Sequence, residues 1–187
     1  MNKPDTHLKD FIHIEKEIVP PNLCNYIVED IKKREWQTHA WYNQVTDEMS
    51  SEPIDEPEVQ EMTSDLHLLL TPHMMSAGNV YSKQYTYPSE RTQHILTEFS
   101  GVRFNRYSGT QHMRLHQDHI QALFDGKIRG IPILSFIVNL NDDYEGADLY
   151  FWDDYTVKLG KGDIVMFPSI FLYPHGVTEV TKGIRYS

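Results

Sequence analysis

Two side chains in the second half of the chain have the types and the spacing of metal ligands. His116 and Asp118 are two residues apart, and in an extended strand such residues point to the same side, where both can bind one ion. His175, 57 positions beyond Asp118, is the candidate third ligand. Two imidazoles and one carboxylate on one side of a metal leave open positions and suit non-haem Fe(II). The pattern therefore predicts a catalytic metal centre made of His116, Asp118 and His175.

An arginine follows the third candidate ligand at a short distance. Arg185 lies ten residues after His175. Its planar guanidinium suits bidentate binding of a carboxylate, such as the one at the far end of 2-oxoglutarate. Arg185 is therefore a candidate carboxylate-binding residue.

Five segments around these residues occur in one order. They are Arg106–Gly109, His116–Asp118, Leu140–Gly146, Lys161–Pro168 and His175–Arg185. Together they resemble the Fe(II)/2-oxoglutarate-dependent dioxygenases of the prolyl 4-hydroxylase type. The resemblance is close over residues 101–187 and loose over the first hundred residues.

This resemblance implies a reaction and a set of binding residues. The cofactors would be Fe(II) and 2-oxoglutarate, with ascorbate as a candidate reductant, and an unactivated C–H bond would be hydroxylated with release of succinate and CO2. Tyr107, nine residues before His116, matches a tyrosine whose hydroxyl contacts the cosubstrate, although a core aromatic is the other interpretation. Asn139 stands where some relatives carry a second such tyrosine. Thr178, three residues after His175, is a further polar candidate near the pocket.

The periodicity of the chain predicts the elements that position these residues. After residue 101, eight short segments with strand character alternate with Gly, Asp and Pro turns, whereas helical spacing occurs before it. This arrangement predicts an α+β, mainly β fold: a double-stranded β-helix, or jelly roll, with supporting N-terminal helices. We expect a single domain over residues 1–187, with 1–100 as support and 101–187 as the catalytic core.

Several elements can be placed individually. Asn22 is the expected N-cap of a helix reaching about Arg34. The other expectations are a strand over 36–45, a helix over 60–75, irregular structure over 76–88, and a strand buried on both faces over 131–140. The sequence ends at Ser187 within an expected last strand, so we expect either a short strand or a truncated chain.

The acidic residues of the chain are concentrated in one segment. The formal net charge is −10, but seven acidic residues and no Lys or Arg lie between Asp47 and Glu61. The remainder carries 20 acids against 17 bases, so the charge counts only weakly against a nucleic-acid partner. The acidic segment 46–60 is expected to be a surface loop, either a solvated linker or a lid over the site.

Cys24 is the single cysteine, so a disulfide within the chain is excluded. This composition favours a reducing compartment, and we expect a cytoplasmic protein with Cys24 buried on a helix. The first ten residues lack the apolar stretch of a signal peptide. The longest apolar run, Ile131–Val138, is far shorter than the roughly 20 residues of a membrane span, so no membrane partner is expected.

The substrate is left open at this point. The resemblance favours a prolyl residue in a peptide or protein. The alternatives are the same chemistry on a small molecule, a free amino acid or an alkylated nucleic acid, or a metal-binding jelly roll without catalysis. The oligomeric state is not indicated.

Overall fold

The computed structural model describes residues 6–43, 48–50, 55–85, 96, 99, 102–118, 124–125 and 129–187. Its helices are a 3-10 helix, η1 (Leu8–Phe11), and two α-helices, α1 (Pro21–Ile31) and α2 (Ser64–Tyr85). The strands are β1 (His13–Glu15), β2 (Gln37–Thr38), β3 (Trp41–Asn43), β4 (Glu48–Ser50), β5 (Glu58–Glu61), β6 (Arg103–Ser108), β7 (Met113–His116), β8 (Phe124–Asp125), β9 (Arg129–Gly130), β10 (Leu134–Val138), β11 (Glu145–Gly146), β12 (Leu149–Phe151), β13 (Tyr155–Val157), β14 (Ile164–Pro168), β15 (His175–Val177), β16 (Val180–Lys182) and β17 (Ile184–Tyr186).

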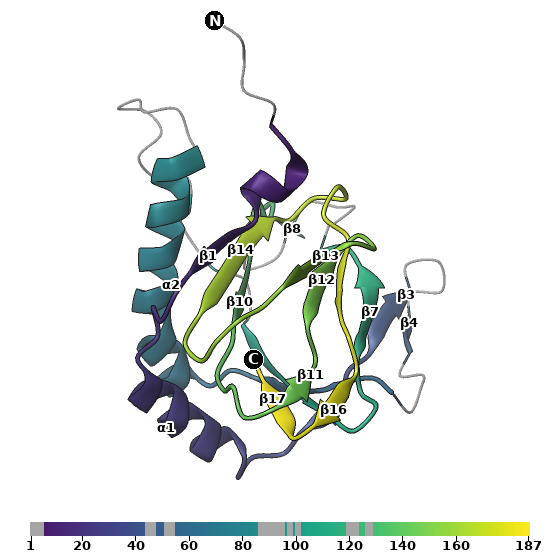
Figure 1. Ribbon diagram of the computed structural model, residues 1–187. Coiled ribbons are helices and arrows are strands. Elements are labelled where there is room, and N and C mark those ends of the chain that lie inside the picture. The colour runs from purple at the N-terminus through teal and green to yellow at the C-terminus, as the bar shows by residue number, and fades with distance from the viewer. Residues whose placement is uncertain are drawn as a thin grey trace, which may run out of the picture.

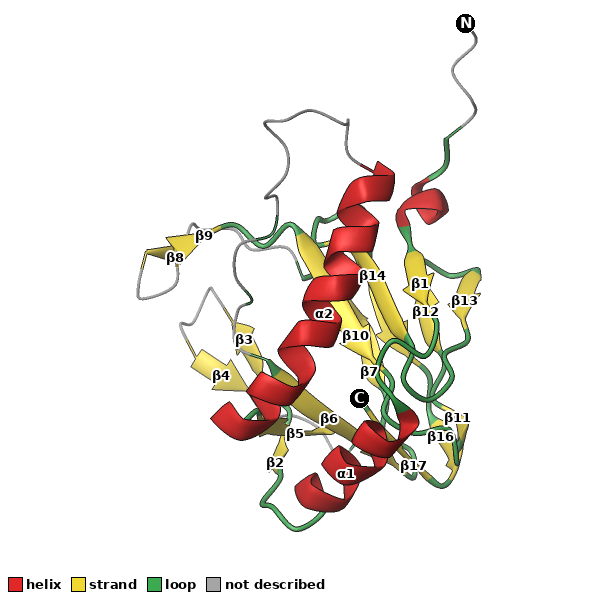
Figure 2. Ribbon diagram, turned by 90° about the vertical axis from the view of Figure 1, so that its left-hand side faces the viewer, coloured by secondary structure: helices red, strands yellow, loops and turns green. Residues whose placement is uncertain are grey.

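The strands form sheets in which all described pairings are antiparallel. The larger sheets have the strand orders β13-β12-β15-β7, β17-β6-β5-β2 and β1-β14-β10. Both α-helices lie on one side of the strands (Figure 1), and α2 passes across β10 and β14 (Figure 2). The described part of the chain is therefore mainly antiparallel β-structure supported by N-terminal helices, as expected.

Strand β14 separates two hydrophobic clusters. Side chains alternate along a strand, so Ile164 and Met166 face the helices, whereas Val165 and Phe167 face the second cluster between the sheets. All four are fully buried. The sequence analysis expected a strand buried on both faces at 131–140, but β10 in that range is only half-buried. The doubly covered strand is β14, because α2 packs on one of its faces and the sheet β13-β12-β15-β7 covers the other.

Helix α1 lies where the sequence analysis expected a helix, but it begins at a different residue. Its buried face is formed by Cys24, Ile27, Val28 and Ile31, which recur every three or four residues. The expected N-cap Asn22 is wrong, because the helix begins at Pro21, whose fixed backbone suits the first turn. Burial raises the pKa of the Cys24 thiol to about 11, as expected of an unreactive core cysteine.

Helix α2 continues ten residues beyond the expected end. Residues 76–85 were expected to be irregular because of Gly78 and the tyrosines, but they are helical. A Cβ at Gly78 would lie 2.6 Å from Leu96 Cδ1 and 3.2 Å from Phe136 Cζ. The glycine therefore permits close approach of the helix to β10 instead of ending it.

The described residues of the region 36–61 contain more strands than the sequence analysis expected. The predicted strand 36–45 is two short strands, β2 and β3, and the expected acidic loop 46–60 contains β4 and most of β5. Strand β4 pairs with β3, and β5 pairs with β6. Residues 44–47 and 51–54 lie outside the described residues. Among the described helices, none has the length and apolar character needed to cross a membrane.

Candidate active site

The three predicted metal ligands meet at one end of the sheet β13-β12-β15-β7. His116 ends β7 and His175 begins β15, and the register of these strands places the two residues opposite each other. Asp118 Oδ1 lies 3.5 Å from His116 Nε2 and 3.8 Å from His175 Nε2. One ligand atom from each residue lies within 4.8 Å of the other two. This spacing suits three ligands around one ion.

Backbone contacts orient both imidazoles. His116 Nδ1 lies 2.9 Å from the carbonyl oxygen of Arg114, and His175 Nδ1 lies 3.1 Å from that of Tyr173. A carbonyl oxygen only accepts, so each Nδ1 carries the hydrogen and each Nε2 of a neutral ring keeps its lone pair for a metal. The second ring nitrogen thus fixes the tautomer that a ligand requires.

Asp118 accepts a hydrogen bond from Ser135, which also contacts Ser169; the sequence analysis identified neither serine. Ser135 Oγ donates to Asp118 Oδ2 at 2.5 Å and lies 2.7 Å from Ser169 Oγ. Burial disfavours the charged carboxylate, but the neighbouring His116 and His175 and the hydrogen bond from Ser135 outweigh it and lower the pKa of Asp118 to about 2. The carboxylate is therefore ionised at neutral pH. A lone serine inside the apolar run 131–140 is the signal that could have identified Ser135.

The ligands range from exposed to buried. The side chain of Asp118 is 37% exposed, that of His116 19% and that of His175 4%. The ring of His175 packs against Phe167 at 4.7 Å and Phe151 at 5.7 Å between centroids. Burial lowers the pKa of His175, which keeps its imidazole neutral and able to bind a metal. The centre therefore opens to solvent on the aspartate side and is enclosed on the His175 side.

An aromatic side chain borders His116 on its other side. The Trp41 ring lies 5.3 Å from the His116 ring and 4.6 Å from the His39 ring. Trp41 Nε1 donates to Glu56 Oε1 at 2.7 Å, and Glu56 is only 5% exposed. Strand β3 and the residues before β5 therefore form a wall of the metal site. The sequence analysis missed this wall because the three residues lie in the first hundred, where the resemblance is loose.

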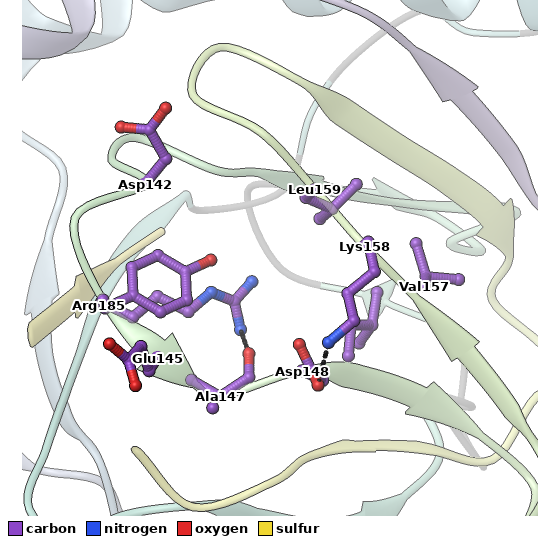
Figure 3. Close-up of a pocket in the computed structure, with 11 residues that line it drawn as sticks. Asp142, Glu145, Ala147, Asp148, Val157, Lys158, Leu159 and Arg185 are labelled. Atoms are coloured by element: carbon purple, nitrogen blue, oxygen red, sulfur yellow. Dashed lines mark hydrogen bonds and ion pairs between the residues drawn. The ribbon is translucent and has the colours of Figure 1, made fainter. Parts of the chain in front are cut away.

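Arg185 lies in the interior on β17. It is 1% exposed, its guanidinium carbon is 5.4 Å from the Tyr107 ring centre, and its Nε donates to Asn139 Oδ1 at 3.1 Å. Its Nη1 donates to the Ala147 carbonyl at 3.3 Å, the contact drawn in Figure 3. Within the described residues it makes no ion pair with a carboxylate. A buried cation with only neutral partners is the arrangement that an anionic ligand would complete.

A pocket of about 340 Å³ reaches Arg185. Figure 3 shows Arg185 at one end of the pocket and the paired side chains of Asp148 and Lys158 at the other. Its floor includes Leu149, and two residues further along the same face of β12 lies Phe151, which pairs with His175. Two residues of a strand span about 7 Å. Strand β12 therefore connects the pocket, which Leu149 lines, with the candidate ligand His175, which pairs with Phe151.

The remaining predicted residues occupy different environments. Tyr107 is 3% exposed, and burial raises the pKa of its hydroxyl, so it stays protonated and can donate a hydrogen bond. Asn139 is fully buried beside Arg185. Thr178 is exposed, and its hydroxyl accepts the backbone N–H of Asp148 at 2.8 Å. Neither Tyr107 nor Thr178 lines the pocket that contains Arg185.

The comparisons with known proteins agree with this geometry. Residues 102–187 match the model of the 2OG-Fe(II) oxygenase superfamily. A PKHD-type hydroxylase of Saccharophagus degradans is 36% identical over 88 residues, which cover 44% of this chain and 38% of that protein. The chain spans about two fifths of the length of the curated relatives that it matches.

Solved structures share the fold over nearly the whole chain. The viral collagen prolyl hydroxylase of Paramecium bursaria Chlorella virus-1, in its 2OG complex, has a TM-score of 0.64 at 15% identity and covers 94% of this chain and 91% of its own. A Trichoplax adhaerens prolyl hydroxylase, in complex with a peptide fragment of hypoxia inducible factor, has a TM-score of 0.66 at 12% identity, covering 94% and 80%. Residues 102–187 are therefore similar to the 2OG-Fe(II) oxygenase superfamily, and the chain shares its fold with prolyl hydroxylases.

Proposed function

We propose that this protein is an Fe(II)- and 2-oxoglutarate-dependent dioxygenase that hydroxylates an unactivated C–H bond. The observation that carries the proposal is the meeting of His116, Asp118 and His175, with both imidazole Nε2 atoms and one carboxylate oxygen converging. Two nitrogens and one oxygen on one side of a metal suit Fe(II) and leave positions for other ligands. The match to the superfamily supports the same assignment.

Each part of the interior has a distinct role in this proposal. His116, Asp118 and His175 would hold Fe(II), and Arg185 would bind the distal carboxylate of 2-oxoglutarate. When bound, Fe(II) and 2-oxoglutarate together activate O2, and the reaction gives succinate, CO2 and the hydroxylated product. Phe151 and Phe167 exclude water from the buried side of the centre. Tyr107 and Thr178 remain candidate cosubstrate contacts.

We propose a prolyl residue in a peptide or protein as the substrate. The support is the likeness to PKHD-type and prolyl hydroxylases, one of them in complex with a peptide fragment. The open, aspartate side of the metal centre is where such a chain could approach. A small molecule, a free amino acid or an alkylated nucleic acid is the alternative substrate, and binding that weakens steeply with salt would favour the last.

The finer assignments of fold and location belong to the same proposal. The sheets β13-β12-β15-β7 and β1-β14-β10 would be the facing layers of a double-stranded β-helix, within one catalytic domain over residues 1–187. The acidic segment 46–60 borders the metal site through Glu56 and remains a candidate lid. A single buried cysteine fits a cytoplasmic protein.

The first test measures succinate formation from 2-oxoglutarate. We expect turnover that requires Fe(II) and is lost in His116→Ala and in Asp118→Ala. His112→Ala is the matched control, because His112 lies four residues before His116 and outside the metal-binding group. Turnover that persists in both ligand variants would refute the dioxygenase assignment. Tight metal binding by a wild-type protein that never consumes 2-oxoglutarate would favour a non-catalytic metal-binding protein.

The second test addresses the prolyl substrate. Proline-containing peptides are incubated with the loaded enzyme, and mass spectrometry should detect the gain of one oxygen atom. Matched peptides with alanine in place of proline are the control. Equal oxidation of both peptides would contradict a prolyl substrate without contradicting the chemistry.

A further inference from the structure

The charges that line the pocket of Arg185 are unevenly paired. Its acidic residues each have a lysine partner: Asp142 with Lys161, Glu145 with Lys182, and Asp148 with Lys158. Arg185, in contrast, contacts only neutral oxygens among the described residues. The pocket therefore holds one buried cation whose charge is unmatched, and an incoming carboxylate would have Arg185 as its partner.

Asn139 lies beside Arg185 but has no donor to offer a ligand. Its amide nitrogen is already within hydrogen-bond distance of three backbone carbonyls. These are Asn141 at 2.7 Å, Leu159 at 3.2 Å and Gly160 at 3.3 Å. Turning the amide toward a ligand would leave buried carbonyls without a donor, which is costly. Asn139 therefore positions Arg185 and is not itself a donor to an anion, in contrast to the expectation from the sequence.

Tyr144 is the residue that can supply a neutral donor to the pocket. Among the lining residues it alone carries a hydroxyl. The hydroxyl donates to Asn139 Oδ1 at 3.1 Å, the same oxygen that accepts from Arg185 Nε at 3.1 Å. If the hydroxyl turned to another acceptor, Asn139 Oδ1 would still have Arg185 as its donor. Tyr144 is therefore free to change partner without leaving a buried group unsatisfied.

From these contacts we infer that the Tyr144 hydroxyl donates a hydrogen bond to the distal carboxylate of 2-oxoglutarate, beside the guanidinium of Arg185. This inference rests on the proposed function. Tyr144 is thus a cosubstrate-binding residue that selects a dicarboxylate over a 2-oxo acid without the second carboxylate. Its carbon framework packs against the interior cluster, and only its hydroxyl takes part in the selection.

The test compares two ligands that differ at the far end. Calorimetry measures binding of 2-oxoglutarate and of 2-oxopentanoate, which has a methyl group in place of the distal carboxylate, to the Mn(II)-loaded protein. Tyr144→Phe should weaken 2-oxoglutarate binding by about tenfold to a hundredfold, the usual value of a hydrogen bond to a charged group. Binding of 2-oxopentanoate and of Mn(II) should not change. Tyr26→Phe, an exposed tyrosine on α1, is the control and should change neither ligand.

The outcomes separate this inference from the function on which it rests. Unchanged 2-oxoglutarate binding in Tyr144→Phe overturns the role of Tyr144, as does an equal loss for both ligands, which would mean general damage to the pocket. In either case the wild-type affinity for 2-oxoglutarate still supports the dioxygenase. A wild-type protein that binds Mn(II) but neither 2-oxo acid overturns the proposed function and the inference together.

Discussion

The candidate metal ligands and Arg185 are stabilised by different kinds of contact. At the candidate metal site, backbone carbonyls orient both histidines, and the Ser135 hydroxyl donates to the aspartate. At the other end, a buried guanidinium rests on a side-chain amide oxygen and one carbonyl. The two histidines and the aspartate could therefore bind a cation. Arg185, in contrast, could bind an anion.

This difference indicates that the two sites would bind ligands of opposite charge. The candidate metal site contains the carboxylate of Asp118, whereas the pocket contains the guanidinium of Arg185. A molecule with a metal-binding group at one end and a carboxylate at the other would satisfy both. Most of the following variants change either the candidate metal site or the Arg185 pocket. The binding affinity of the unchanged site then serves as the control.

The largest effect is expected from Asp118→Ala. It removes the anionic ligand, so the affinity for Mn(II) should fall by more than about a hundredfold, beyond the range typical of residues that only support a ligand. Calorimetric titration of the metal-free protein measures it. Asp142→Ala, which removes a carboxylate at the pocket, should leave the metal affinity unchanged. A similar loss in both variants would contradict the separation of the two ends.

Removal of the Arg185 guanidinium should affect 2-oxoglutarate binding and not metal binding. Arg185→Met should weaken 2-oxoglutarate binding to the Mn(II)-loaded protein by about thirtyfold or more, the range for truncating one partner of a buried charge pair. Mn(II) affinity should remain that of the wild type. Arg185→Lys should restore only part of the binding, because an ammonium lacks the planar fork. Full restoration by lysine would show that charge alone anchors the ligand.

Ser135→Ala should have an intermediate effect at the metal end. Without the Ser135 hydroxyl, Asp118 Oδ2 loses its hydrogen bond and the carboxylate is less firmly oriented. The Mn(II) affinity should therefore fall by about tenfold to a hundredfold. Ser135→Thr keeps the hydroxyl and should recover most of the affinity. Ser169→Ala removes only the contact to Ser135 and should cost less. If Ser169→Ala weakens metal binding more than Ser135→Ala, the proposed order of contacts is wrong.

The smallest effect is a pH dependence of the metal-free protein. Burial lowers the folded-state pKa of His175 and also that of His39. Below the unfolded-state value of about 6.5, the unfolded chain therefore binds protons that the folded chain excludes, and stability falls as the pH decreases. Asp118, with a pKa of about 2, adds its own loss only at more acidic pH.

Thermal melts of the metal-free protein between about pH 7.5 and pH 5.5, on either side of the ordinary histidine value, measure this dependence. His175→Gln should show a shallower decrease in melting temperature than the wild type, and His39→Gln should isolate the other histidine. Equal slopes in all three proteins would mean that neither buried imidazole resists protonation.

The sequence analysis succeeded where side-chain spacing carries information by itself. The three candidate ligands chosen by residue type and order, His116, Asp118 and His175, lie within 4.8 Å of one another, although β7 ends at His116 and Asp118 lies beyond it. It failed where packing overrides local propensity. Gly78 suggests the end of a helix, yet it lies within α2. Its missing side chain leaves room for the Phe136 ring beside the helix. Ser135, Trp41 and Glu56 were missed because their contacts join residues far apart in sequence.

The chain alone thus predicted the candidate ligand types and the mainly β architecture, since these follow from the chemistry of His, Asp and Arg and from periodicity. Tertiary structure decided which groups remain free to bind. Asn139 and Tyr144 are both polar in sequence, but only the fold shows that the amide donates to backbone carbonyls while the hydroxyl can change its acceptor. The physical reason is that a polar group can bind a ligand only if its present partners keep another hydrogen bond when it turns away. Those partners come from segments distant in sequence, so only the fold reveals them.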